Sequence, residues 1–136
     1  MSLHFHHIGV ACRDLDAETL RLATLGYAVE GPDFTDPTQG VRGRFLSGGG
    51  PRLELLAPLA AEGFLTPWLR VGVKMYHLAY ETSDFDSDFA QLRGQGAKVV
   101  VRPVPAVAFD AKRIAFLMLP NMMLTELIAT TEPTAQ

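Results

Sequence analysis

The stretch HIGVACRDLD, residues 7–16, decides the fold because the chain repeats its pattern 70 residues further on. There HLAYETSDFD, residues 77–86, again begins with a histidine and ends with two aspartates in the same places. In both stretches a short apolar run predicts a buried strand, and the spacing of apolar residues after the aspartates predicts a helix. A glycine follows each predicted helix at the same offset, Gly26 and Gly96. The chain therefore contains a duplicated strand–helix unit.

Three further strands are predicted after each helix, separated by runs of turn-forming Gly, Pro and Asp. They lie at residues 27–30, 41–46 and 52–56 in the first half and at 97–102, 113–119 and 124–130 in the second. We therefore expect an α+β fold of two tandem βαβββ modules that form an open, curved, mostly antiparallel sheet. Its parts are a first module at 4–60, a connecting helix within 61–73, a second module at 74–130 and a frayed tail at 131–136, all in one domain.

The composition indicates a folded domain and excludes several partners. The 136 residues are 48% hydrophobic and 20% charged, which is enough apolar material for a core. The formal net charge is -3 and no basic run is present, so nucleic acid is not expected as a partner. The sequence shows neither a signal peptide nor an apolar run of membrane-spanning length, so we expect a cytoplasmic protein.

Each module carries one histidine and one glutamate in an apolar strand, His7 with Glu54 and His77 with Glu126. If the modules pair with pseudo-twofold symmetry, strand alternation would aim all four side chains at one concavity. A lone strand histidine is more often an ordinary core residue, but a buried glutamate is costly, so a cation would explain both residue types together. We interpret the four as ligands of a divalent ion, for which Ni, Co, Mn, Fe and Zn all suit a mixed nitrogen and oxygen set.

The motifs HHIGVA, LELLAPL, YHLAYE, KRIAFL and TELI make the chain similar to the glyoxalase, or vicinal oxygen chelate, superfamily over about residues 7–129. Within it, the chain resembles the methylmalonyl-CoA epimerase branch most. The resemblance implies that His7, Glu54, His77 and Glu126 hold the metal, and that Glu126 and Glu54 move a proton next to a metal-stabilised anion. It also implies a small-molecule substrate, such as an acyl-CoA or another thioester. We expect a homodimer, because an open sheet leaves edges and faces to cover.

Two departures from the epimerase branch fall in the predicted substrate site. That branch has a catalytic glutamate on the third strand just after a QGV turn, whereas the matching position here is Gly43. The loop before the seventh strand is PVPAVAFDAKRI in place of a glycine-rich turn. Five residues are candidate substrate contacts: Gly43, Phe45, Phe109, Arg113 and Met118. Of these, Arg113 matches the family motif, and Phe45 could fill the space that the missing glutamate leaves.

The sequence thus favours a metal-dependent isomerase or epimerase that transfers a proton next to a carbonyl or thioester. One alternative is a lactoylglutathione lyase of the glyoxalase I type, which keeps all four ligands and needs no glutamate at position 43. Another is an extradiol dioxygenase, although its iron(II) site uses two histidines and one carboxylate, so Glu54 argues against it. The last is a non-catalytic resistance protein that binds a small molecule and needs no metal.

Overall fold

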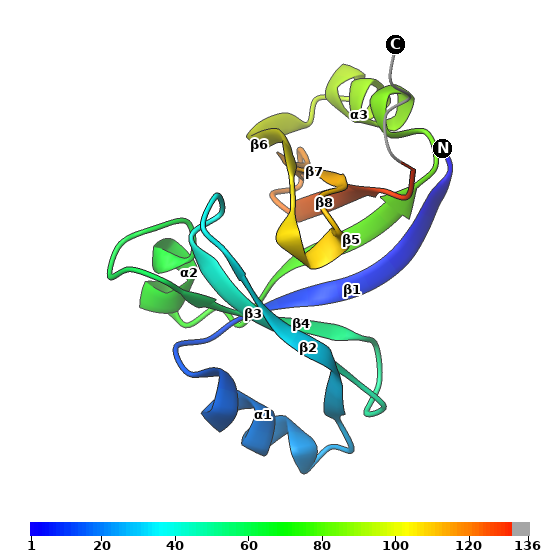
Figure 1. The fold of residues 1–136 in the computed structure, drawn as a ribbon. Coiled ribbons are helices and arrows are strands. Elements are labelled where there is room, and N and C mark those ends of the chain that lie inside the picture. Colours follow the sequence, from blue (N-terminus) through cyan, green and yellow to red (C-terminus); the bar gives the residue numbers. More distant parts are fainter. Residues whose placement is uncertain (132–136) are drawn as a thin grey trace. The chain divides into compact units, whose positions relative to one another are not determined.

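The structure is a computed structural model that describes residues 1–131. In chain order its elements are β1 (Leu3–Ala11), α1 (Leu15–Ala23), β2 (Ala28–Asp36), β3 (Val41–Ser47), β4 (Leu53–Pro58), α2 (Thr66–Val71), β5 (Met75–Thr82), α3 (Phe85–Gly94), β6 (Lys98–Pro105), the short 3-10 helix η1 (Val107–Phe109), β7 (Arg113–Met118) and β8 (Leu124–Ala129). The order confirms the α+β class and the two βαβββ modules (Figure 1). The expected tail at 131–136 lies, except for its first residue, outside the described part of the chain.

The chain forms two compact units, which share one sheet plan. The first unit is His7–Tyr76, and the second is Met1–His6 with His77–Gln136, so the division falls inside β1. Strand order in the first unit is β2-β3-β4-β1, and in the second it is β6-β7-β8-β5. In each unit the first strand of the module pairs parallel with the last, and the remaining pairs are antiparallel. The duplication seen in the sequence is therefore a duplication of strand pairing.

The first helix begins directly after Asp14 and ends at Ala23, three residues before Gly26. Asp14 is the N-cap of α1, and its side chain accepts hydrogen bonds from the backbone N–H groups of Asp16 and Ala17. After the helix, Gly26 has φ +97°, and Gly96 has φ +100° after α3. Glycine adopts this left-handed conformation without the steric cost that a Cβ would add, which explains why both modules carry it at the same offset.

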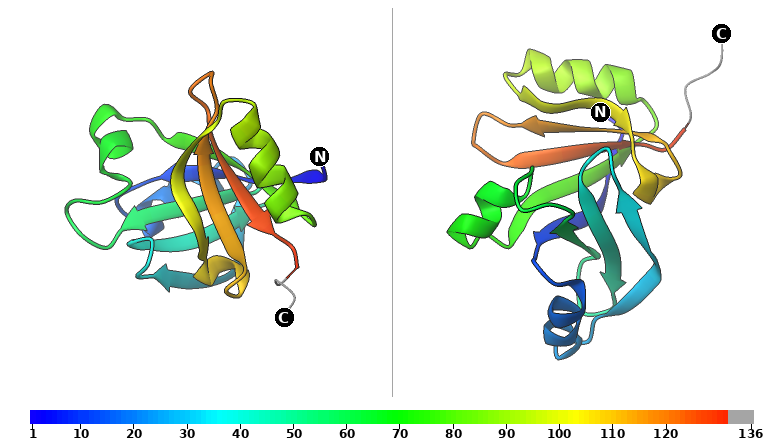
Figure 2. Two further views of the ribbon diagram at one scale, coloured as in Figure 1. Left: turned by 90° about the horizontal axis from the view of Figure 1, so that it is seen from above. Right: turned by 60° about the vertical axis from the view of Figure 1, so that its left-hand side comes forward.

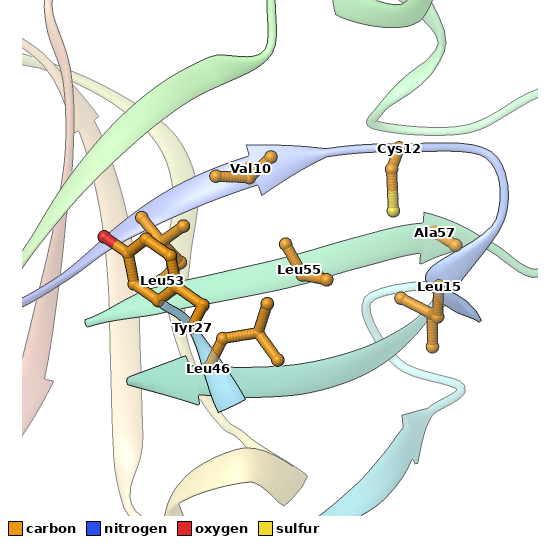
Figure 3. Packing of buried hydrophobic residues seen from close by; sticks show 8 residues of the cluster. All are labelled: Val10, Cys12, Leu15, Tyr27, Leu46, Leu53, Leu55 and Ala57. Carbon is orange, nitrogen blue, oxygen red and sulfur yellow. The ribbon is translucent and has the colours of Figure 1, made fainter. Parts of the chain in front are cut away.

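Each sheet buries one face against the helix of its own unit, which we call the helix face. In the first unit that core contains Val10, Cys12, Leu15, Tyr27, Leu46, Leu53, Leu55 and Ala57 (Figure 3). In the second unit it contains Phe85, Leu92, Ala97, Ala115, Leu117, Leu127 and Ala129, and α3 runs alongside this sheet (Figure 2). Because side chains alternate along a strand, the intervening residues point to the opposite face, which we call the site face.

Strands β2 and β6 continue well beyond the ends that the sequence predicts. Strand β2 continues to Asp36 across the Gly-Pro-Asp run at 31–33, which was expected to be a turn, and β6 continues to Pro105. Both are the outermost strands of their units, where a missing backbone N–H does not break a ladder. A register shift between Glu30 and Phe34 accommodates the run as a β-bulge. Across residues 1–131, no helix has the length and apolar character needed to cross a membrane.

Candidate metal centre

In the first unit, His7 and Glu54 form a buried pair on the site face. His7 is 0% exposed and Glu54 is 4% exposed. The imidazole Nε2 of His7 lies 3.1 Å from Oε1 of Glu54. The parallel register of β1 and β4 explains the contact, because Glu54 lies opposite Gly9, two residues beyond His7 and therefore on the same face.

The second unit repeats this pair with His77 and Glu126, which are 3% and 2% exposed. Here Nε2 lies 3.2 Å from Oε1, and Glu126 lies opposite Ala79, again two residues beyond the histidine. The same register in two strand pairs that share no residues shows that the geometry belongs to the module and not to one accidental contact.

An aromatic ring supports the histidine in each unit. The edge-to-face partner of His7 is Phe45, with ring centroids 5.5 Å apart, and that of His77 is Phe116, at 5.0 Å. Phe45 pairs in register with Glu54, and Phe116 pairs with Glu126. Each ring therefore lies next to the glutamate, on the adjacent strand and on the same face of the sheet. Phe116 was not singled out from the sequence, but its match to Phe45 in the repeat was a signal that could have identified it.

The donor set fits a divalent metal ion. The two pairs supply two imidazoles and two carboxylates, all of them buried. Two ligand atoms at right angles, each about 2.1 Å from an ion, lie about 3 Å apart, which is close to the nitrogen–oxygen distance in both pairs. A cation would also offset the cost of burying carboxylates, which is several kcal/mol per charge without compensation. The residues present therefore suit the ion that the resemblance implies.

Gly43 faces the same side as Phe45, and its place is filled by a residue that the sequence analysis did not single out. A Cβ built on Gly43 would lie 2.0 Å from Cζ of Phe34. The ring above Gly43 is thus that of Phe34, whereas the sequence suggested Phe45 for this space. Phe45 instead lies between Phe34 and His7, with ring centroids 5.8 Å from Phe34.

The three predicted substrate contacts in the second unit lie in different surroundings. Met118 is half-buried and, by alternation with Phe116, belongs to the site face. Phe109, in η1, makes an edge contact with His6 at 5.5 Å. Arg113 belongs to the helix face. Its guanidinium lies 4.6 Å from the ring centroid of Phe85 and 2.9 Å from Oδ1 of Asp86. These contacts favour a role for Arg113 in packing α3.

Comparisons with known proteins identify the family of this chain. Residues 6–116 match the family described as the Glyoxalase/Bleomycin resistance protein/Dioxygenase superfamily. The chain belongs to this superfamily. Its two βαβββ modules therefore have the fold of a member of that class.

Methylmalonyl-CoA epimerases are among the similar proteins by both sequence and structure. An ethylmalonyl-CoA/methylmalonyl-CoA epimerase of Cereibacter sphaeroides is 30% identical over 117 residues, covering 82% of this chain and 85% of the relative. A Glu→Gln variant of the Streptomyces coelicolor methylmalonyl-CoA epimerase, solved with 2-nitronate-propionyl-CoA, is 32% identical, with a TM-score of 0.79 over 96% of this chain and 99% of that one. The Mycobacterium tuberculosis methylmalonyl-CoA epimerase is 27% identical, with a TM-score of 0.77 over 93% of this chain and 87% of that one.

Proposed function

We propose that this chain is a metal-dependent isomerase or epimerase that moves a proton at the carbon beside a carbonyl or thioester group. The observation that carries the proposal is the buried His/Glu pair, present in both modules with nitrogen–oxygen distances of 3.1 and 3.2 Å. The epimerase relatives support the reaction type, and the solved epimerase bound to an acyl-CoA analogue supports a thioester substrate.

In this proposal His7, Glu54, His77 and Glu126 hold one divalent ion. When bound, the ion polarises the substrate carbonyl and stabilises the negative charge that follows loss of the adjacent proton. Ni, Co, Mn, Fe or Zn would suit the two imidazoles and two carboxylates. Metal analysis of the purified protein should give one ion per chain, and X-ray absorption should report nitrogen and oxygen ligands without sulfur.

The proton-transfer groups are Glu126 and Glu54. Each carboxylate lies on the site face of its unit, shielded from water and held by a histidine. A carboxylate in such surroundings can take a proton from a carbon acid, and a carboxyl group that has been protonated from solvent can donate one. Because each module contributes one such group, one carboxylate removes the substrate proton, and the other, protonated from solvent, donates a proton to the same carbon.

The test is hydrogen exchange at the reacting carbon. Incubation of a chiral 2-substituted acyl-CoA, such as methylmalonyl-CoA, with the metal-loaded protein in D2O should place deuterium on C2, as followed by mass spectrometry and by loss of optical rotation. The Glu126→Gln variant should abolish the exchange. No exchange on any acyl thioester by protein of verified metal content would refute the proposal.

A glyoxalase I type activity is the second candidate, because Glu54 completes a set of two histidines and two carboxylates and because Gly43 supplies no third-strand carboxylate. Methylglyoxal and glutathione with the nickel-loaded protein would then give lactoylglutathione, which is followed by absorbance. Formation of that product without exchange of acyl thioesters would replace the first assignment. The homodimer and the cytoplasmic location expected from the sequence stay predictions, and light scattering tests the first of them.

A further inference from the structure

The ring of Phe34 occupies the space that a side chain at position 43 would need. Phe34 and Gly43 lie directly opposite each other in the antiparallel register of β2 and β3. The position of a side chain on Gly43 falls 2.0, 2.5 and 2.6 Å from three carbon atoms of the Phe34 ring. Even a methyl group there would overlap the ring, because the optimal separation of two non-bonded carbon atoms is about 3.5 Å or more. A residue with any side chain at position 43 would displace Phe34.

Phe34 is fixed in this place from two directions. The β-bulge that precedes it contains Gly31, whose φ of +76° suits glycine. The neighbouring residue Asp33 receives two hydrogen bonds of 2.8 Å from the guanidinium of Arg44. That bidentate contact holds the pKa of the Asp33 carboxyl below its ordinary range. The backbone that carries Phe34 is therefore restrained by the bulge before it and by the ion pair of Asp33.

Arg44 also ties this segment to α1. Its guanidinium lies 2.9 Å from the hydroxyl oxygen of Thr19 and 3.0 Å from a carboxylate oxygen of Asp16. The Arg44 side chain is 13% exposed, so the arginine partner of these contacts is shielded from water. Arg44 consequently links the bulge of β2, through Asp33, to two residues of α1.

Phe34 reaches the metal-ligand pair through one further ring. Its ring centroid lies 5.8 Å from that of Phe45, which in turn lies 5.5 Å from the ring of His7. Leu56 is opposite Gly43 on β4 and belongs to the same site face. Phe34 and Phe45 remain partly exposed, so a ligand held at His7 would meet an aromatic wall on the β3 side.

We propose that Phe34 is a specificity-determining residue that gives this site an apolar wall, so that the substrate presents an uncharged alkyl or aryl group toward β3. The inference rests on the proposed proton transfer beside a thioester. In the epimerase branch that the chain resembles, a glutamate occupies the position of Gly43. A carboxylate there and the ring of Phe34 cannot occupy the same space, so proton transfer is left to the carboxylates of the two His/Glu pairs. A thioester substrate with a free carboxylate on C2 that faced the ring would lose hydration of that charge without gaining a partner.

The packing part of the proposal is tested without any substrate. Gly43→Ala should lower the melting temperature of the otherwise native protein, whereas the same change in a Phe34→Ala background should lower it little further. Gly63→Ala is the matched control, because nothing lies within 4 Å of the added Cβ and the melting temperature should be unchanged. Equal effects of Gly43→Ala in the two backgrounds would overturn the proposed pairing of the residues.

The specificity part is tested with two probes, 2-methylbutyryl-CoA, which has an uncharged C2 substituent, and methylmalonyl-CoA, which has a charged one. We expect the metal-loaded wild type to exchange the C2 hydrogen of the uncharged probe at least tenfold faster in D2O. The Phe34→Ala/Gly43→Glu double variant should reduce or reverse that preference by tenfold or more. Exchange of both probes without preference, or a preference for the charged probe in the wild type, would overturn the role of Phe34. Exchange of neither would overturn the proposed function and the specificity with it, while the stability measurements would still report on the packing.

Discussion

Replacing Glu54 by Gln should affect the melting temperature differently with and without metal. Glutamine keeps an oxygen that can accept the hydrogen bond from Nε2 of His7, which lies 3.1 Å from the carboxylate oxygen. It also removes a charge that is 4% exposed and therefore costly to bury. Without metal, we expect the variant to melt no lower than the wild type. With metal, it should gain much less stability, because an anionic ligand has been lost.

The size of the difference follows from linkage between binding and folding. An ion present at a hundred times its dissociation constant stabilises the folded state by about 2.7 kcal/mol. For a chain of this length, that corresponds to a rise in melting temperature of about 10 °C. If the variant binds the ion about a hundredfold more weakly, the same concentration contributes about 0.4 kcal/mol, a rise of less than about 2 °C.

The assay is thermal unfolding followed by circular dichroism after EDTA treatment and dialysis, with and without Ni, Co, Mn or Zn. Glu126→Gln should behave in the same way, because its pair with His77 has a nitrogen–oxygen distance of 3.2 Å. Glu62→Gln is the matched control, since this exposed carboxylate pairs with Arg70 and should leave both melting temperatures unchanged. Equal metal-induced shifts in wild type and Glu54→Gln would refute the assignment of Glu54 as a ligand.

Three further properties of the fold can be measured without knowledge of the reaction. Burial raises the pKa of Asp88, but hydrogen bonds from Thr82 and Ser2 outweigh this effect, so the pKa of the folded protein lies below the ordinary 3.8. The ionised Asp88 should therefore stabilise the fold fully above pH 3.8, and this contribution should be lost as the pH falls through the folded pKa. Urea titrations should show the loss in the wild type and not in Asp88→Asn. Burial raises the pKa of the Cys12 thiol to about 11, so iodoacetamide at neutral pH should alkylate the native protein far more slowly than the urea-unfolded chain, and equal rates would contradict this burial. Leu55→Ala, at a core position that is 0% exposed, should cost about 2–5 kcal/mol of unfolding free energy, and a loss below about 1 kcal/mol would show that the site collapses around the smaller residue.

The repeat in the sequence was sufficient to predict the order of helices and strands along the chain and the histidine and glutamate that belong to each module. Spacing works here because a strand with period 2 fixes the face of every residue once one is known. His7 and Glu54 therefore had to share a face if their strands paired with Glu54 opposite Gly9, which is the observed register. The same alternation, applied to β7, would have placed Arg113 with Ala115 on the helix face, so this position was predictable although it was not predicted.

The role of Phe34 could not be predicted by the same argument. The Gly-Pro-Asp run before it favours a turn, and a bulge changes the number of residues that separate two paired positions. Counting along the sequence therefore does not reveal that Phe34 lies opposite Gly43. The available signal was a glycine inside an apolar strand, since an aromatic ring from a neighbouring strand often covers the space that such a glycine leaves.

The equivalence of the two His/Glu pairs makes each module an internal reference for the other. A spherical ion has no means of distinguishing two ligand pairs of the same composition and register, so Glu54→Gln and Glu126→Gln should weaken its binding to a similar extent. A chiral substrate has no twofold axis and must engage the two carboxylates differently. Any difference in turnover between these variants at equal metal occupancy therefore measures the asymmetry that the substrate imposes on a duplicated protein.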